Sequence, residues 1–158
     1  MEKILITFGT HPLAQRLGKL LNTSFSLLFA SSEPFPNILL RQNYRKIPTG
    51  VNPTFAHEVL KICLDEGITQ VLPLGKKEIQ PLNETRVLFQ EYGIELLVPQ
   101  DTKAFFVLDN PSRELSVRVY KDGVDVLLGE QMANDTAFSG AGILSDSEEE
   151  MIWCLVNE

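Results

Sequence analysis

Two loops in the sequence carry residues that could bind or transform a small polar molecule. The first is Gly9-Thr10-His11-Pro12, which follows the apolar run KILITF. Histidine titrates near neutral pH, so it can act as an acid, a base or a hydrogen-bonding contact. His11 therefore has two interpretations. It is either a ligand contact or acid–base group, or a loop histidine that bonds to nearby backbone, which is the commoner use.

The second loop is Pro73-Leu74-Gly75-Lys76-Lys77-Glu78, after another short apolar run. Lys76 and Glu78 could pair there with a small anion or an amine. A plain helix start, where the helix dipole favours Glu78, would need no ligand. A third polar loop, from Thr49 to Asn52, is expected to complete the same rim. The candidate ligand-binding residues are Gly9, Thr10, His11, Thr49, Gly50, Asn52, Leu74, Gly75, Lys76 and Glu78.

Several familiar catalytic and cofactor motifs are missing. After Gly9 the next glycine is Gly18, so the G-x-G-x-x-G fingerprint of dinucleotide binding is absent, although helix amides could still hold a carboxylate or phosphate. No G-x-S-x-G elbow and no Cys/His cluster occurs. The polar segment from Asn134 to Gly140 is interpreted as turn chemistry. We expect no cofactor and no metal, and we assign no catalytic residue.

Alternating strand and helix patterns must position these loops. Apolar runs predict strands over 3–8, 25–30, 44–48, 70–74 and 94–99, and amphipathic segments predict helices between them. This order predicts an α/β, three-layer, Rossmann-like domain, with a parallel sheet of order 3-2-1-4-5 connected by right-handed crossovers. The three loops would then meet at the carboxyl edge of the sheet, where open α/β folds bind ligands.

The C-terminal part of the sequence predicts an extension of this domain. Asp122-Gly123 between alternating apolar runs indicates a β-hairpin. Ser145-Asp146-Ser147-Glu148 matches a capping box, which predicts a short closing helix that carries Trp153. We expect an α/β domain over 1–110 and a hairpin-and-helix extension over 111–158 packed on it. Residues 31–43 predict a connection with one helical turn, and 101–113 give no clear pattern.

Composition excludes some partners. The net charge of -7 and a pI near 4.9 argue against nucleic acid, which needs clustered Lys and Arg. No apolar run approaches the roughly 20 residues needed to span a bilayer, and the N-terminus does not resemble a signal peptide. Cys63 and Cys154 lie inside apolar runs, which is typical of buried reduced thiols. These features together predict a cytoplasmic protein.

About the first 100 residues resemble the N-terminal domain of ATP-grasp ligases. The similarity is carried by ILITFG at the start, by EGITQVLPLG, and by the strand GIELLVP after a proline loop and a helix. It implies the Rossmann-like domain found in biotin carboxylase and carbamoyl-phosphate synthase. At the family's Leu-x-(Asp/Asn)-Lys junction this chain reads Leu108-Asp109-Asn110-Pro111, without the lysine. The remaining residues are too few for the lobes that grip ATP and magnesium, so the ligase activity is not carried over.

The expected function is that of a noncatalytic, stand-alone relative of the ATP-grasp N-terminal domain. It would bind a small anionic metabolite at the carboxyl edge of the sheet, or act as an interaction module. As an interaction module it would form a homodimer or dock on a separately encoded partner, and an edge strand such as VDVLL would favour pairing. The alternative is a small enzyme or an unconventional nucleotide-binding domain that acts on an anionic metabolite. That alternative would use the Gly9–His11 and Pro73–Glu78 loops.

Overall fold

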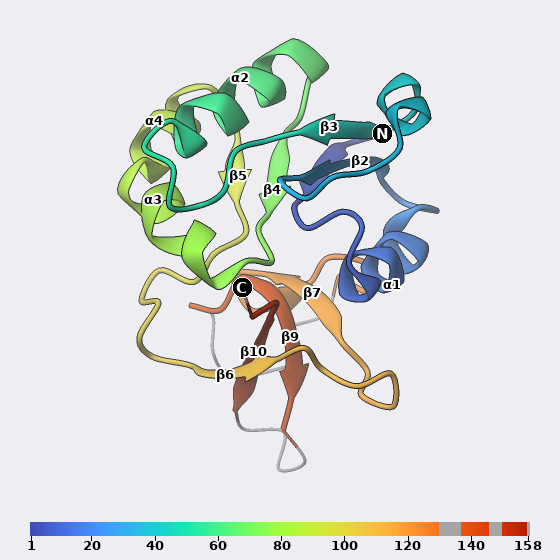
Figure 1. Ribbon diagram of the computed structural model, residues 1–158. Helices are drawn as coiled ribbons and strands as arrows, with labels where there is room; N and C mark the ends of the chain where they lie inside the picture. Colours follow the sequence, from blue (N-terminus) through green and yellow to red (C-terminus); the bar gives the residue numbers. More distant parts are fainter. Residues whose placement is uncertain (130–136, 146–149, 158) are drawn as a thin grey trace.

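The computed structural model describes residues 1–129, 137–145 and 150–157, which contain two five-stranded sheets (Figure 1). The first sheet is parallel, in the order β3-β2-β1-β4-β5. Its strands are β1 (Lys3–Ile6), β2 (Ser26–Ser31), β3 (Tyr44–Lys46), β4 (Gln70–Leu72) and β5 (Glu95–Leu96). This confirms the predicted α/β class and strand order.

Helices cover both faces of the parallel sheet. On one face α1 (Pro12–Leu21) shares a core with Ile4, Ile6 and Leu72. On the other face Leu5 and Val71 share a core with α2 (Phe55–Glu66), α3 (Ile79–Glu84) and α4 (Arg86–Glu91) (Figure 1). Two short 3-10 helices, η1 (Asn37–Arg41) and η2 (Lys76–Glu78), complete the set, and η1 confirms the turn expected within 31–43.

The helix predicted between β4 and β5 is interrupted. It is divided into η2, α3 and α4, with the break at Thr85. The Thr85 hydroxyl donates to the carbonyls of Pro81 and Leu82 at 2.9 and 3.1 Å. A side chain that bonds back to carbonyls of its own helix competes with the regular ladder, which explains the break.

The second sheet is built from the C-terminal part of the chain, in the order β6-β10-β9-β7-β8. Its hairpin of β7 (Arg118–Lys121) and β8 (Val124–Asp125) confirms the predicted turn, because Asp122 and Gly123 have φ of 51° and 78°. The edge strand β6 (Phe106–Asp109) runs parallel to β10 and lies just before the domain boundary expected at residue 110.

The prediction of a closing helix was wrong. Residues Met151–Leu155 form strand β10, which pairs with β9 (Gly140–Leu144) and β6. Trp153 and Leu155 enter one core and Cys154 and Val156 the other, so the segment is buried on both faces, as a central strand requires. Residues 146–148 of the apparent capping box lie outside the described residues. Ser145 instead exchanges hydrogen bonds with Glu150 beside the β9–β10 connection.

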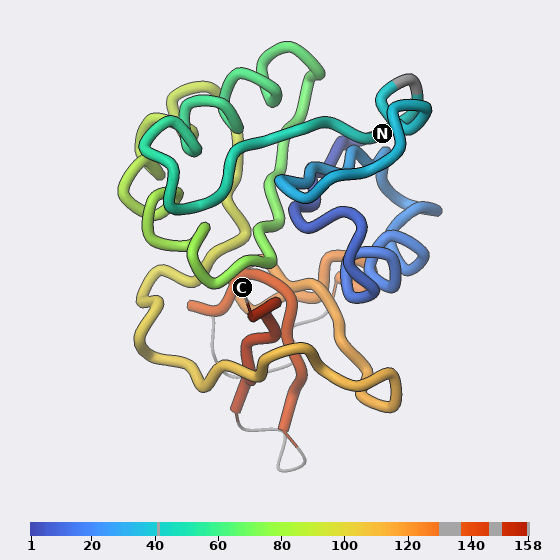
Figure 2. Tube along the Cα trace, in the orientation of Figure 1, coloured from blue at the N-terminus to red at the C-terminus, as the bar shows by residue number. Residues whose placement is uncertain are grey.

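The two sheets meet at the carboxyl edge of the parallel sheet. Val156, directly after β10, forms an isolated parallel bridge with Gly75, and its amide donates to the Leu74 carbonyl at 2.7 Å. The end of the chain therefore lies at the junction between the sheets (Figure 2). Along the described residues, no helix is long and apolar enough to cross a membrane.

Candidate functional site

Two neighbouring regions at the carboxyl edge of the parallel sheet could hold a ligand. The first is the crevice between β1 and β4, where successive connections leave in opposite directions; we call it the switch-point crevice. Open α/β sheets usually bind their ligands at such a point. The second is a cavity over the ends of β1, β2 and β3, which we call the flanking cavity.

The chain's own hydrogen bonds fill the switch-point crevice. The Thr7 hydroxyl, which is fully buried, donates to Glu78 Oε1 at 2.5 Å and accepts from the Leu74 amide at 2.8 Å. The Gly75 amide also donates to Glu78 Oε1, at 3.1 Å. Glu78 is only 2% exposed. Its carboxylate therefore joins the loops after β1 and β4, and is not presented to a ligand.

Val156 covers the same crevice by pairing with the backbone of the loop after β4. It accepts a hydrogen bond from the Lys76 amide at 3.4 Å and donates to the Leu74 carbonyl, so it occupies backbone groups on both sides of Gly75. The Lys76 side chain extends elsewhere and pairs with Asp109 at 3.1 Å. The candidates Leu74, Gly75, Lys76 and Glu78 thus form a structural junction between the two sheets.

Two predicted glycines serve close packing. A Cβ on Gly9 would lie 2.6 Å from Phe29 Cβ, so this glycine lets the loop cross β2. A Cβ on Gly50 would lie 2.6 Å from the carbonyl carbon and oxygen of Lys77. The Thr49–Gly50 loop therefore meets the Lys76–Glu78 loop, as predicted, through backbone contact.

Two other predicted residues lie at exposed turns. Asn52 Oδ1 accepts from the Thr54 amide at 2.9 Å and from its hydroxyl at 2.8 Å, which is a local turn interaction. Thr10 is exposed in the loop before α1. Neither residue is among those that line the flanking cavity.

The flanking cavity has a volume of about 480 Å³, within the usual range of small-molecule sites. Three consecutive β–α loops supply part of its wall, and the C-terminal part of the chain supplies the rest. The lining residues are Phe8, His11, Ser32, Glu33, Pro34, Thr49, Asn110, Val156 and Asn157. Of the predicted candidates, the structure brings His11 and Thr49 together here.

Glu33 and Asn110 line the cavity but were not predicted from the sequence. Glu33 follows β2 directly, so the carboxyl-edge rule that selected His11 could also have selected it. Asn110 comes from the end of β6, in a segment without a clear pattern, and no local signal placed it beside the parallel sheet.

His11 is both the N-cap of α1 and a wall of the cavity. Its Nδ1 accepts a hydrogen bond from the Leu13 amide at 3.1 Å, which requires an unprotonated Nδ1. Burial lowers the pKa of His11 below its ordinary value, and the Glu33 carboxylate opposes part of that shift. At neutral pH the imidazole is therefore uncharged, with its proton on Nε2 available to a ligand. Since Pro12 has no N–H and His11 caps Leu13, the start of α1 is a poor phosphate cradle.

Two residues that line the cavity have unusual backbone conformations. Phe8 has φ of 53° and Asn110 has φ of 49°, the left-handed region that favours glycine. The other described non-glycine residue of this kind, Asp122, lies in the β7–β8 turn. Strained backbone of this kind clusters at ligand-binding and active sites, where the surrounding structure maintains it.

The chemistry of the lining is polar and mildly acidic. Glu33 provides a carboxylate, Thr49 a hydroxyl and Asn110 a carboxamide whose Oδ1 accepts from the Asn157 amide at 3.4 Å. Among the described lining residues there is no lysine or arginine. The described part of the chain also contains no cluster of three His, Cys, Asp or Glu side chains suited to a metal ion. This lining can bind hydroxyl and ammonium groups better than phosphates.

A comparison with protein-family models and with curated proteins finds no match for this chain, so its function must be argued from the site itself.

Proposed function

We propose that the protein is a noncatalytic, stand-alone relative of the ATP-grasp N-terminal domain that binds a small, amine- or hydroxyl-bearing metabolite in the flanking cavity. One observation supports this above the others. Loops from three neighbouring strands place His11, Glu33 and Thr49 around one cavity at the carboxyl edge of the sheet. The left-handed backbone at Phe8 and Asn110 in the same wall adds support.

The contacts of the other candidates favour binding over catalysis. A small enzyme would combine His11 with Lys76 or Glu78, but Lys76 pairs with Asp109 and Glu78 bonds to Thr7. Of these three, His11 alone lines the flanking cavity, and its Nδ1 already caps α1. Nucleotide binding at the switch-point crevice would require Val156 to leave its bonds with Leu74 and Lys76.

The electrostatics of the cavity change the expected charge of the ligand. The sequence suggested an anionic metabolite because Lys76 follows β4. In the structure the cavity is lined by Glu33 and by a neutral His11, while the Lys76 ammonium lies beside Asp109. A ligand ammonium could pair with Glu33, and ligand hydroxyls could accept from His11 Nε2 and bond to Thr49. The buried, unpaired thiols of Cys63 and Cys154 agree with the proposed cytoplasmic location.

A thermal-shift panel tests this proposal. It contains amino alcohols, polyamines, sugars and amino acids, together with dicarboxylates, NAD and ATP with magnesium. A ligand present at about a hundred times its dissociation constant stabilises a protein by about 2.7 kcal/mol, which should raise the melting midpoint by about 5–10 °C. We expect such a shift with an amine- or hydroxyl-rich compound, and we expect Glu33→Gln to lose it.

The matched control is Glu58→Gln, which removes an exposed carboxylate on α2 away from the cavity and should keep the full shift. A shift with ATP and magnesium alone would contradict the proposal and favour nucleotide chemistry. A shift that survives Glu33→Gln unchanged would place the ligand elsewhere.

A further inference from the structure

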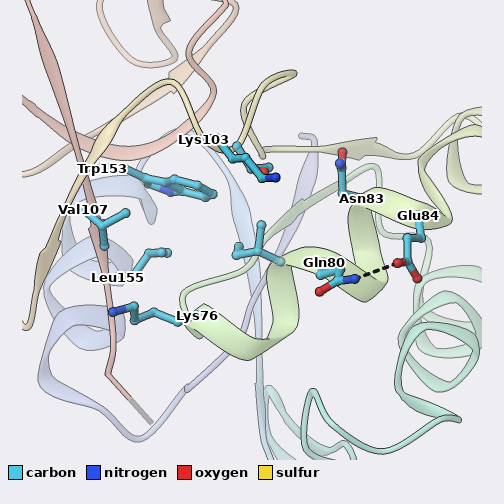
Figure 3. Close-up of a pocket in the computed structure, with 10 residues that line it drawn as sticks. Lys76, Gln80, Asn83, Glu84, Lys103, Val107, Trp153 and Leu155 are labelled. Atoms are coloured by element: carbon cyan, nitrogen blue, oxygen red, sulfur yellow. Dashed lines mark hydrogen bonds between the residues drawn. The ribbon is translucent and has the colours of Figure 1, made fainter.

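A second concave region lies between α3 and the second sheet, away from the flanking cavity. It has a volume of about 500 Å³, and we call it the α3–β6 groove. Figure 3 shows Val107, Trp153 and Leu155 along the strand side, with Gln80, Asn83 and Glu84 along the helix side. Lys76 and Lys103 lie towards opposite ends of the groove. The strand side is apolar, with Val107 from β6 and Trp153 and Leu155 from β10, and the helix side is polar.

The outer edge of β6 is open. In the second sheet β6 is a terminal strand, and within the described part of the chain no strand pairs with its other side. The Asn110 amide donates inward to the Leu155 carbonyl at 2.9 Å. Because inward and outward groups alternate along a strand, the amide and carbonyl groups of Val107 and Asp109 point outward. Phe106 and Val107 are 76% and 40% exposed, so the edge is also apolar.

The groove carries charges of both signs. Asp109 pairs with Lys76, and the Gln80 side chain donates to Glu84 Oε1 at 3.0 Å, the dashed line in Figure 3. The Lys103 ammonium has no hydrogen-bond or ion-pair partner among the residues that the structure describes. Lys103 therefore offers an ammonium group at the end of the groove where the chain enters β6. The Glu84 carboxylate, whose partner is the neutral Gln80 amide, offers a negative charge on the helix side.

We propose that the α3–β6 groove binds an extended peptide segment of a partner protein, which adds a strand to β6. The outward backbone groups of Val107 and Asp109 would supply the main-chain hydrogen bonds. Alternate side chains of the added strand would point towards α3. One would cover the apolar floor beside Val107, and an acidic one would pair with Lys103. This interaction is independent of the proposed metabolite site, and a domain of the size of this chain can carry both.

The free edge and the groove favour a peptide strand over a small molecule. Trp153 and Ile79 on the groove floor are only 2% and 6% exposed, so they offer little surface to a small apolar ligand. The accessible groups are the backbone edge, Val107, Lys103 and Glu84, so an added strand would place an acidic residue beside Lys103. The opposite edge strand, β8, spans only Val124–Asp125 and offers a much shorter edge.

The test uses the full chain labelled with ¹⁵N and two matched sets of capped peptides. Each peptide alternates valine and threonine, with a single aspartate at a scanned position in one set and a single lysine in the other. We expect the best aspartate peptide to bind about two- to fivefold more tightly than its lysine counterpart, the effect of one surface charge pair. The amide signals of Val107, Asp109 and α3 should shift on binding.

Three variants locate the interaction. Lys103→Glu should reverse the preference between the two sets. Val107→Pro removes an outward amide without touching the β6–β10 ladder and should weaken binding at least about tenfold. If the proline disturbs folding, Val107→Lys serves as the second variant, because it replaces the apolar side chain that lines the groove with a charged one. Lys61→Glu, at an exposed position on α2, is the charge control and should bind like the original chain.

Three results would overturn the proposal. The first is that no peptide of either set binds at about 1 mM, weaker than transient recognition normally requires. The second is equal binding of both sets that Lys103→Glu does not alter. The third is a dimer in light scattering that Val107→Lys dissociates, because the edge would then serve a second copy of the chain.

Discussion

The switch-point crevice and the flanking cavity lie side by side on one sheet edge, yet they have opposite properties. In the crevice, Thr7, Glu78 and Val156 satisfy one another and the adjacent backbone. In the cavity, the Glu33 carboxylate and the Thr49 hydroxyl have no hydrogen-bond partner among the described residues. A position at the carboxyl edge therefore does not by itself make a ligand site. What matters is which polar groups the chain leaves available.

The largest loss of stability is expected when the carboxylate of the crevice is removed. Glu78→Ala leaves the buried Thr7 hydroxyl and the Gly75 amide without their acceptor, and each such loss costs about 1–3 kcal/mol. We expect the free energy of unfolding to fall by about 3 kcal/mol and the melting midpoint by about 6–12 °C. Urea unfolding measures the first quantity and calorimetry the second.

The control for that change is Glu84→Ala on the exposed side of α3, which should stay within about 0.5 kcal/mol of the original chain. If Glu78→Ala were equally mild, Glu78 would not be a structural residue, and its role as a ligand contact would have to be reconsidered.

A smaller loss is expected where the two loops touch. Gly50→Ala would place its Cβ 2.6 Å from backbone atoms of Lys77, which cannot move aside as a flexible side chain can. We expect a loss of about 1–3 kcal/mol, measured by urea unfolding. An unchanged midpoint would show that the Thr49–Gly50 loop does not rest on the Lys76–Glu78 loop.

The cavity side has a pH-dependent feature. The pKa of His11 is lowered in the folded protein, so the folded state resists protonation and protonation removes the acceptor for Leu13. The stabilisation is complete above the ordinary histidine pKa of about 6.5 and is lost as pH falls below it, by up to about 1 kcal/mol for a helix cap. His11→Asn keeps a capping side chain that does not titrate.

Melting midpoints from pH 8 to pH 5 measure this effect as a difference between the two proteins. The original chain should lose more stability than His11→Asn over the acidic half of that range. Parallel curves would contradict the capping role of His11.

The smallest effect on stability is expected at Asn110. Glycine adopts a φ of 49° without strain, so Asn110→Gly should change the free energy of unfolding by no more than about 0.5 kcal/mol. The same change should weaken any ligand of the flanking cavity, because it removes a hydrogen-bonding carboxamide. Calorimetric titration with a compound that stabilises the original chain tests this, and unchanged affinity would remove Asn110 from the site.

The parallel sheet was predictable because its strands are short apolar runs separated by helical patterns and by turns such as Glu66-Gly67. Strand β10 was not predictable, because MIWCLV is apolar at every position and its period does not distinguish a buried strand from a helix. Its central position depends on pairing with β6, which lies far earlier in the chain, and with β9, and the two cores bury its faces.

Part of the candidate site was also predictable from the sequence. The carboxyl-edge rule identified His11 and Thr49, because a strand end is visible in the sequence. It could not show that Lys76 pairs with Asp109, or that Val156 closes the crevice, since both depend on the second sheet. The sequence shows which residues lie at the sheet edge, but their bonding partners are set by tertiary contacts and cannot be predicted from it.

The most direct test of the account follows the amide signals of the ¹⁵N-labelled protein as the best compound of the thermal-shift panel is added. We expect the signals of His11, Glu33, Thr49 and Asn110 to move, while those of Leu74, Gly75 and Val156 stay in place. Movement of Leu74, Gly75 and Val156 instead would contradict it, because the ligand would then have displaced Val156 and entered the switch-point crevice.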